Sequence, residues 1–572
     1  MPSLWTRLPA FLALPILSAI RRRQRRENLH DTSTIEAPGF PQLPAPTPRQ
    51  QRARTADGSY NDLATPAMGC VGARFGRNVP VNQAIPDSGA TLLTPSPRTV
   101  SLELLTRDRF KPATSLNLLA AAWIQFQLHD WVSHGPNDQD RMIEVPLDPA
   151  DSWPERPMVV RRTGRDRTRP EQTSHPTPTF QNHETHWWDG SQIYGSSAAT
   201  LQRVRAGHDG KLAIGPDRLL PVDGDGIEVT GVTGNWWVGL GLLHTLFTLE
   251  HNAVCDRLQK AHPHWSDDEL FDHARLVNAA VMAKIHTVEW TPGILATPTI
   301  DAALNGNWNT IRRSKPDHHA APYSLTEEFV SVYRMHPLIP DEFQFSSHQT
   351  GTLLQARTLE NVLGANSRQL MTQMPVEDVL YSFGTSHPGA ITLHNFPRLF
   401  QRFERPNAPL IDLAAVDILR DRERGVPRYN KFRRLFNMDP VRSFEELTDN
   451  PTWAQELKRV YENHIERVDL MIGLFAEPLP RNFGFSETAF RVFLLMASRR
   501  LQSDRFFTSD YREEIYSKEG LQWIEDATMA RVILRHYPKL AAALGGVKHA
   551  FAPWKAVAAP AAAGAGARPA GV

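Results

Sequence analysis

Six stretches of the chain repeat apolar residues every three or four positions, which places them on one face of an α-helix. These stretches are Ser115–Val132, Gly241–Gln259, Ser266–Trp290, Thr326–Met335, Pro451–Phe475 and Glu487–Leu501. Several end at Gly or Pro, residues that favour helix ends. Alternating apolar and polar runs, the pattern of half-buried strands, are scarce, and no repeat of fixed period occurs. The pattern predicts a mainly α fold with very little β, and it argues against a helical solenoid.

The chain divides into three parts by composition. Residues 36–100 are rich in Pro, Gly, Asn and Asp without a sustained period, so we expect an irregular wrap there. The last residues, Ala556–Val572, are Ala/Gly/Pro-rich and predict a disordered tail. Because no long Gly/Ser linker divides the middle, we expect an N-terminal segment over 1–35, one catalytic domain over 36–555 and the tail over 556–572.

Composition narrows the classes of function. The chain has 572 residues and 41% hydrophobic content, enough to bury a large core. Its 63 Lys and Arg balance 62 Asp and Glu, which argues against a nucleic-acid partner, since such binding needs a dense basic surface. The two cysteines, Cys70 and Cys255, are too few for a disulfide scaffold. We therefore expect folding in a reducing compartment and a cytoplasmic location.

An apolar run near the N-terminus, Leu8–Ile20, is followed at once by five arginines. It is too short to span a bilayer. A signal peptide is disfavoured because most of the charge follows the run instead of preceding it. Two interpretations stay open for residues 5–26. They form either an interfacial segment in peripheral contact with a membrane, or a helix packed on the protein's own surface.

Two segments carry histidines in apolar surroundings. In AAWIQFQLHDWVSHG, Gln125 and His129 are four residues apart and share one helical face. In VSVYRMHPLIPDEF, Tyr333 and His336 are three residues apart and are expected to share one helical face, and Pro337 is expected to stop the helix just after the histidine. A histidine in an apolar helix is more often a satisfied core residue than a ligand. Each segment alone therefore favours a structural role over a metal site.

Taken together, the two segments resemble the fatty-acid α-dioxygenases of the haem peroxidase and cyclooxygenase superfamily. In that family a glutamine precedes the distal histidine by four residues and an aspartate follows it, which matches Gln125, His129 and Asp130. Its Y-R-M-H motif carries the radical tyrosine and the proximal histidine, which matches Tyr333 and His336. Further shared motifs run to about residue 540: RTADG (54–58), FGRNVP (75–80), EHNAVCDRL (250–258), WTPGIL (290–295) and SRRLQSDRFFT (498–508).

The resemblance implies an animal haem-peroxidase-like helical fold and one haem b held by His336. Secreted mammalian-type peroxidases have, before the distal histidine, an aspartate that esterifies the haem, whereas this chain has Leu128. We therefore expect the haem to be non-covalent. Cyclooxygenases carry an EGF-like module with several disulfides, which two cysteines cannot build. The α-dioxygenase branch is favoured.

The resemblance also implies a calcium site. The segment THWWDGSQIYG places oxygen-bearing residues at alternate positions around a glycine, which by itself is usually just a turn. The family binds Ca²⁺ with a T-x-W-x-D-x-S loop and the aspartate after the distal histidine. The matching positions are Thr185, the Trp187 carbonyl, Asp189, Ser191 and Asp130.

The substrate carboxylate is held in this family by a histidine and a threonine of an H-x-x-x-W-T motif and by an arginine of the S-R-R-L stretch. These positions match His286, Thr291 and Arg500. An arginine suits the role because its guanidinium binds a carboxylate bidentately. Arg499 and Arg505 lie in the same stretch, and they are the alternatives to Arg500.

The activity implied is fatty-acid α-dioxygenation with peroxide as activator. His129 would shuttle a proton, and a radical on Tyr333 would take the C2 hydrogen so that O₂ adds to give a 2-hydroperoxy acid. Three alternatives stay open: a peroxidase that oxidises small donors without needing Tyr333, a related cyclooxygenase-like fatty-acid dioxygenase, and a haem-binding homologue without turnover.

Overall fold

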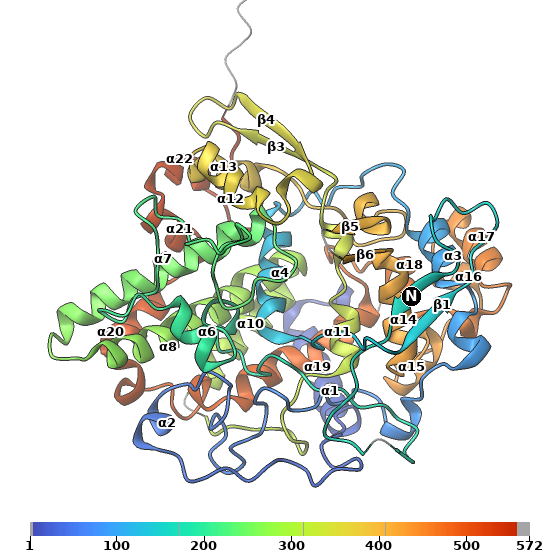
Figure 1. Cartoon of the computed structure of the whole chain (residues 1–572), viewed down its shortest axis with the longest axis horizontal. Helices are drawn as coiled ribbons and strands as arrows, with labels where there is room; N and C mark the ends of the chain where they lie inside the picture. Colours follow the sequence, from blue (N-terminus) through green and yellow to red (C-terminus); the bar gives the residue numbers. More distant parts are fainter. Residues whose placement is uncertain (1–3, 171, 313, 406–407, 558–572) are drawn as a thin grey trace, which may run out of the picture.

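The computed structural model describes residues 4–170, 172–312, 314–405 and 408–557 (Figure 1). Its α-helices are α1 (Ala10–Glu27), α2 (Pro48–Arg52), α3 (Pro97–Val100), α4 (Leu119–Trp131), α5 (Ser191–Tyr194), α6 (Ala198–Val204), α7 (Val238–Ala261), α8 (Asp267–Ile285), α9 (Thr291–Ile294), α10 (Pro298–Ile311), α11 (Glu327–Val332), α12 (Asn366–Gln373), α13 (Val376–Thr385), α14 (Leu413–Glu423), α15 (Tyr429–Leu435), α16 (Phe444–Leu447), α17 (Pro451–Val460), α18 (Leu470–Ala476), α19 (Glu487–Ser503), α20 (Glu513–Asp526), α21 (Met529–His536) and α22 (Ala541–Leu544). The strands are β1 (Met142–Val145), β2 (Met158–Arg161), β3 (Glu342–Ser346), β4 (Leu353–Thr358), β5 (Phe403–Arg405) and β6 (Ala408–Ile411).

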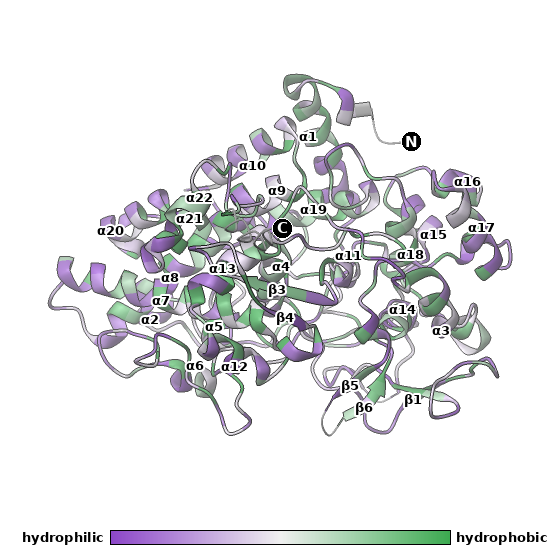
Figure 2. Ribbon diagram, turned by 90° about the horizontal axis from the view of Figure 1, so that it is seen from above, coloured by the Kyte–Doolittle hydropathy of each residue, from purple (hydrophilic) through white to green (hydrophobic). Residues whose placement is uncertain are grey.

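The strands form three separate antiparallel hairpins, β1–β2, β3–β4 and β5–β6. Figure 1 shows β3–β4 at the top of the molecule and β1 at its right side, and Figure 2 shows β5–β6 at the lower edge. The expected mainly α fold with very little β is confirmed.

The core is built around α4, which is buried along most of its length and packs on α7. Its apolar residues include Trp123 and Phe126, whose rings contact each other and the ring of Phe247 from α7. Helix α7 in turn packs on α8, and α20 covers α8. An apolar helix such as α4 can be stable in this position because neighbouring helices surround it on all sides.

The predicted helix 266–290 is continuous, but its last turn changes type. Ser266 caps its start, because the hydroxyl accepts from the Glu269 amide and the Glu269 carboxylate accepts from the Ser266 amide in return. After Ile285 the backbone continues as a π-helical turn, His286–Trp290, and then as α9. Such π-turns are frequent at functional sites.

Two predicted helices have different bounds. The stretch 451–475 is broken into α17 and α18, because Glu462 and Asn463 adopt left-handed backbone conformations between them. Apolar spacing continues across the break, so periodicity alone could not locate it. The stretch 326–335 forms a helix only as far as Val332.

The N-terminal segment forms α1, which packs against α10 and α19 at the edge of the molecule (Figure 2). Ala13, Leu17 and Gln24 are buried against the body, whereas Phe11 and Leu12 are 73% and 47% exposed. Within the described part of the chain, no helix combines the length and apolarity needed to cross a bilayer.

The wrap after α1 is irregular, as expected, and contains only short helical turns up to residue 100. The predicted tail, 556–572, lies outside the described residues from 558 onward.

Candidate active site

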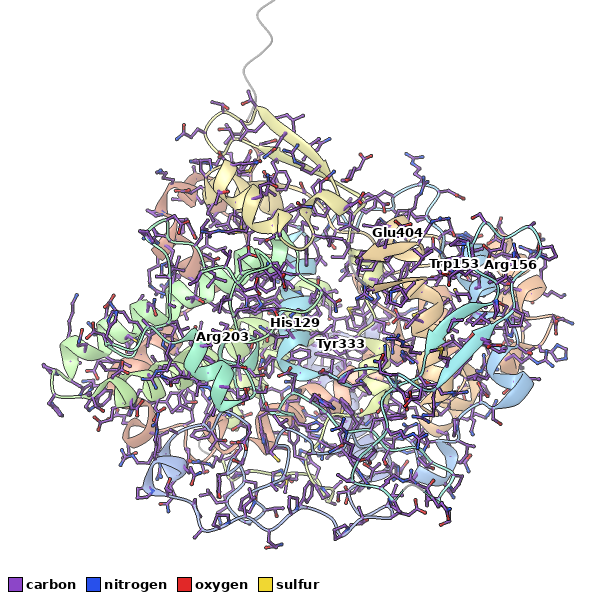
Figure 3. All side chains as sticks on the ribbon, in the orientation of Figure 1. His129, Trp153, Arg156, Arg203, Tyr333 and Glu404 are labelled. Atoms are coloured by element: carbon purple, nitrogen blue, oxygen red, sulfur yellow. The ribbon has the colours of Figure 1, made fainter. Side chains whose placement is uncertain are left out.

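His129 lies in the last turn of α4, and Figure 3 shows it near the middle of the molecule. Its Nδ1 is buried and makes no hydrogen bond with any described residue. Burial lowers its pKa to about 4, so the imidazole is neutral at pH 7 and can accept a proton. A buried ring nitrogen without a protein partner indicates that another group completes this site.

Gln125 lies one helical turn before His129 and is fixed by two partners. Its Oε1 accepts from the Trp237 indole at 2.8 Å, and its Nε2 donates to the Asn235 carbonyl at 3.2 Å. These contacts set the orientation of the amide on the His129 side of α4. Sequence reasoning did not identify Trp237 or Asn235 as its partners.

His336 begins a short 3₁₀ turn, His336–Leu338, and packs against the rings of Phe396 and Phe400. Its Nδ1 lies 3.0 Å from Oδ2 of Asp417 on α14. A carboxylate at Nδ1 fixes the ring of a metal-binding histidine and leaves Nε2 for the metal. His336 can therefore offer Nε2 to a metal ion, and His129 has an unpartnered Nδ1, so the chemistry of both residues fits a haem site.

Asp417 is a site residue that sequence reasoning missed. Its carboxylate also pairs with Arg334, while Arg334 lies 3.6 Å from Asp421 one turn further along α14. Burial acts to raise the pKa of Asp417, but the charges of Arg334 and His336 and the hydrogen bonds that they make together lower it overall. The sequence does show two carboxylates, Asp417 and Asp421, one helical turn apart. Their partners come from distant parts of the chain, so this spacing alone did not indicate a site.

A cavity lies between the end of α4, the π-turn after α8, and α19. About 380 Å³ of space free of protein atoms lies there, part of it open to solvent. Its walls are mainly apolar or aromatic: Trp131, Trp188, His286, Thr287, Thr291, Leu304, Asn307, Phe329, Tyr333, Phe493, Ala497, Ser498, Arg500 and Leu501. The three predicted carboxylate-binding residues and Tyr333 thus line one space.

Arg500 is 2% exposed, and its guanidinium lies over the rings of Trp131 and Trp188, at 3.9 and 4.5 Å from their centroids. Its Nε and Nη2 make no hydrogen bond with the described residues. A buried cation with unsatisfied N–H groups beside a cavity has the chemistry of an anion site. The two tryptophans were not identified from sequence, since only their packing shows their role.

The two alternative arginines, Arg499 and Arg505, hydrogen-bond to groups outside the cavity. Arg499 donates to the backbone carbonyls of His318, Ala321, Pro322 and Ser324. Arg505 pairs with Asp510 and donates to carbonyls of the N-terminal wrap. Of these three arginines, Arg500 alone lines the cavity.

His286 and Thr291 flank the π-turn. The Trp123 indole donates to Nδ1 of His286 at 3.2 Å, so in the neutral ring the proton is on Nε2. Burial keeps the ring neutral by lowering its pKa well below the usual value. The Thr291 hydroxyl donates to the His286 carbonyl at 2.8 Å, so it must rotate before it can donate to a ligand.

Tyr333 caps the end of α11 and is buried, with its ring perpendicular to that of Trp131 and close to Phe329. Burial raises its pKa, so the phenol keeps its hydrogen. The expectation that Tyr333 and His336 share one helical face is wrong, because α11 ends at Val332 and a new turn begins at His336. Figure 3 shows Tyr333 near the middle of the molecule, as it does His129.

Buried oxygens gather where α4 ends. The Ser191 amide donates to Oδ1 of Asp130 at 2.6 Å and to Oδ1 of Asp189 at 3.1 Å, and the Thr185 hydroxyl lies 3.5 Å from the Trp187 carbonyl. Oδ2 of Asp130 has no partner among the described residues. Burial and then the charge of Asp189 raise the pKa of Asp130 well above its usual value.

This oxygen cluster holds only two carboxylates. No group of three or more His, Cys, Asp or Glu side chains within the described ranges forms a candidate metal site. The other oxygens come from hydroxyls and a carbonyl, ligands that suit a hard cation such as Ca²⁺. Arg275 lies 3.3 Å from Asp189 and partly balances its charge.

Comparisons with known proteins agree on one group. The animal haem peroxidase family model matches residues 53–545. Alpha-dioxygenase 2 of Arabidopsis thaliana is 37% identical over 96% of this chain and 91% of that protein. Alpha-dioxygenase PIOX of Oryza sativa is 37% identical over 89% of this chain and 87% of that protein.

Solved structures give the same result. A tyrosine-to-phenylalanine variant of Oryza sativa fatty acid alpha-dioxygenase with palmitic acid superposes with a TM-score of 0.89 at 35% identity, covering 97% of this chain and 95% of that one. Fatty acid alpha-dioxygenase of Arabidopsis thaliana gives 0.89 at 36% identity, covering 99% and 92%.

The low pKa of His129 generates a prediction for the haem-loaded protein. Because His129 stays neutral down to a pKa of about 4, peroxide consumption should be nearly constant from pH 8 to about pH 5 and fall as the pH approaches 4. The measurement is the initial rate against pH, with His129→Gln as the control, which should be about 100-fold slower throughout. A midpoint near pH 6.5 in the wild type would show an ordinary histidine instead.

Proposed function

Because the chain belongs to the α-dioxygenases of the animal haem peroxidase family, we propose that it oxygenates fatty acids at C2 with Tyr333 as the hydrogen-abstracting residue. The observation that carries the proposal is the cavity in which Arg500, with two unsatisfied N–H groups, and the phenol of Tyr333 line the same space. A carboxylate bound to Arg500 would present its neighbouring carbon, C2, to that part of the cavity.

The substrate is a long-chain fatty acid, as in the relative solved with palmitic acid. Its carboxylate receives hydrogen bonds from Arg500 and from Nε2 of His286, with Thr291 as a third donor once its hydroxyl rotates. Leu304, Phe493 and Leu501 give the cavity an apolar wall for the alkyl chain. Because the carboxylate and the alkyl chain are both held in place, the reaction between C2 and Tyr333 becomes effectively intramolecular.

The reaction at C2 balances without further reagents. The Tyr333 phenoxyl oxygen takes one hydrogen atom from C2 and becomes a phenol, leaving a carbon radical. O₂ adds to that carbon, and the resulting peroxyl radical takes the hydrogen back from Tyr333. The net change is insertion of one O₂ into one C–H bond, which gives a 2-hydroperoxy acid and restores the radical on Tyr333.

The cofactor is one haem b, with Nε2 of His336 as the ligand and the Asp417 carboxylate 3.0 Å from Nδ1. When bound, the haem supplies the oxidising power of peroxide that first forms the radical on Tyr333. His129, neutral and with an unpartnered Nδ1, accepts and returns the peroxide proton. Gln125 lies on the same face of α4 and holds a fixed amide beside it. Leu128 offers no carboxylate for an ester, which supports a non-covalent haem.

A calcium ion in the oxygen cluster is the second bound group that we propose. Asp130, Thr185, the Trp187 carbonyl, Asp189 and Ser191 would supply its ligands. The orphaned Oδ2 of Asp130 and the closeness of two buried carboxylates support a cation there, since two such charges otherwise repel. The ion would hold the end of α4, where the negative end of the helix dipole also favours a cation.

Residues 5–26 also support peripheral contact with a membrane. On α1, Phe11, Leu12 and Ile16 are exposed at 73%, 47% and 38%, and Arg22 and Arg26 are exposed on the following turns. Apolar side chains next to basic ones suit the interface of an anionic bilayer. The same helix is packed on the body through Ala13 and Leu17. One side of α1 therefore fits a helix packed on the protein's own surface, and the other side fits a segment in contact with a membrane.

The radical role of Tyr333 predicts a selective loss. Tyr333→Phe should abolish fatty-acid oxygenation while haem content and peroxide consumption stay within about twofold of wild type, because the phenyl ring keeps the packing but has no hydrogen-accepting oxygen. Oxygen uptake with palmitate and peroxide consumption are measured on the same preparation. Retained oxygenation would reject the tyrosyl mechanism, and loss of both reactions would assign Tyr333 a structural role.

The carboxylate-binding role of Arg500 predicts a change in the specificity constant, kcat/KM, for palmitate. Arg500→Gln should lower kcat/KM for palmitate by about 100-fold, since a charge-assisted hydrogen bond to a buried group is worth about 2–3 kcal/mol. Arg499→Gln is the comparison: it should lower Tm, because its loop carbonyls lose their donor, but leave kcat/KM within about threefold. The reverse pattern would transfer the role to Arg499.

The calcium site predicts a metal-dependent stability. EGTA should lower the Tm of the wild type by several degrees, and Ca²⁺ but not Mg²⁺ should restore it, because the ion binds only the folded state. Asp130→Asn should lower Tm and remove the response to EGTA. Elemental analysis that finds no calcium in the purified protein would reject the site.

A further inference from the structure

The second half of α1 faces the outer end of the cavity. Nη1 of Arg21 donates to Oδ1 of Asn307 at 3.0 Å and to Oγ of Ser498 at 3.3 Å, and Nη2 of Arg25 donates to the same Ser498 hydroxyl at 2.7 Å. Asn307 on α10 and Ser498 on α19 both line the cavity. Arg21 therefore bridges the two helices that flank the cavity, at the edge of the molecule where α1 lies (Figure 2).

These arginines are held by hydrogen bonds to neutral side chains. In the parts of the chain that the structure describes, neither Arg21 nor Arg25 makes an ion pair, and the pair on this helix joins exposed Arg23 to Glu27 instead. Burial, followed by the charge of Arg21, lowers the pKa of Arg25 to about 9, and the charge of Asp317 opposes this shift only in part. The two half-buried cations lie one helical turn apart, so their repulsion is only partly offset and a bound anion would offset it further.

Unsatisfied polar atoms point to the same place. The Nε atoms of Arg21 and Arg25 are buried without hydrogen-bond partners, and so are both amide atoms of Gln24, which is 2% exposed on the same face of α1. Each buried polar group without a hydrogen-bond partner destabilises the folded state. Several of them on one helix face, beside two cations that make no ion pair with a described residue, indicate a ligand that brings both negative charge and hydrogen-bond acceptors.

The positive charge continues inward to Arg500. Arg499 donates only to backbone carbonyls, and Arg500 is the cation that the proposed function assigns to the substrate carboxylate. An anion at Arg21 and Arg25 would contact Ser498, which lines the same cavity as Arg500 and lies two residues before it on α19. The proposed function already assigns a fatty-acid carboxylate to Arg500, so the same kind of anion suits both places.

We propose that Arg21 and Arg25, with Ser498, form a mouth site that binds the carboxylate of an incoming fatty acid before it moves to Arg500. This inference rests on the proposed function, and it assigns to the mouth site a role in substrate access rather than in chemistry. The carboxylate replaces Ser498 and Asn307 as the acceptor, which releases the bridge that Arg21 makes between α10 and α19. Exposed Phe11, Leu12 and Ile16 on the same helix keep the alkyl chain or a lipid surface close by.

The test is the rate at which palmitate associates with the haem-loaded protein, followed by stopped-flow tryptophan fluorescence, since Trp131 and Trp188 line the cavity. Arg21→Gln/Arg25→Gln should lower the association rate constant about tenfold, a magnitude typical of lost electrostatic steering. The Kd and the kcat at saturating palmitate should stay within about twofold, because the final site at Arg500 is intact.

The matched control is Arg22→Gln/Arg26→Gln. It removes the same charge at the same spacing on the same helix, but from exposed positions. Its association rate should change by less than about twofold. Arg21→Lys/Arg25→Lys should restore most of the rate, and the salt dependence of association should be weaker in the glutamine variant than in wild type. A loss that lysine cannot rescue, with a matching fall in Tm, would show that the arginines only hold α1 in place.

Three other results would overturn the mouth site. They are an unchanged association rate in Arg21→Gln/Arg25→Gln, an equal fall in the control pair, and loss of binding to phosphatidylglycerol vesicles with normal palmitate association. The last result would assign the arginines to lipid phosphate. If the wild type oxygenates palmitate but the association rate is the same without these arginines, only the mouth site is rejected. If the wild type neither binds nor oxygenates palmitate, the proposed function fails first.

Discussion

A buried guanidinium that makes no ion pair with the described residues is the constraint on which this site depends. Arg500 lies over the rings of Trp131 and Trp188, two of its nitrogen atoms have no hydrogen-bond partner among those residues, and it opens onto an apolar cavity. Aromatic faces stabilise a cation but satisfy few of its hydrogen bonds. Burying a charge costs free energy unless an opposite charge pairs with it, so this position favours the binding of an anion. The carboxylate of a fatty acid supplies that charge, and its position determines which carbon lies near Tyr333.

Three consecutive residues at the end of α4 connect the parts of the site. Successive residues point about 100° apart around a helix, so His129, Asp130 and Trp131 face three different surroundings. His129 faces the proposed haem, Asp130 enters the oxygen cluster, and Trp131 forms one wall around Arg500. A shift or fraying of this single turn would disturb all three at once. A cation bound at Asp130 therefore has a physical reason to affect catalysis without touching the substrate.

The sequence predicted the long buried helices well, because their apolar spacing reflects the packing that stabilises them; α4, α7, α8 and α19 lie within or close to the predicted ranges. The predicted helix ends were wrong where local backbone geometry ends the helix, at Glu462 and Asn463 and after Val332. The candidate site residues came from the resemblance, since spacing alone left His129 and His336 as ordinary core histidines. Sequence could not choose among Arg499, Arg500 and Arg505, because only their hydrogen-bond partners differ. Asp417 and the two tryptophans act through contacts with segments far away in the chain, which no local pattern encodes.

The central claim is that the carboxylate at Arg500 places C2 of the fatty acid at Tyr333, and isotope labelling tests it most directly. The haem-loaded wild type would be given palmitate carrying deuterium at C2, under ¹⁸O₂, alongside unlabelled acid. The account predicts slower turnover of the deuterated acid and a 2-hydroperoxy product in which both hydroperoxide oxygen atoms are ¹⁸O. Equal rates for the two acids together with oxygen at another carbon, or unlabelled hydroperoxide oxygen drawn from peroxide or water, would contradict it.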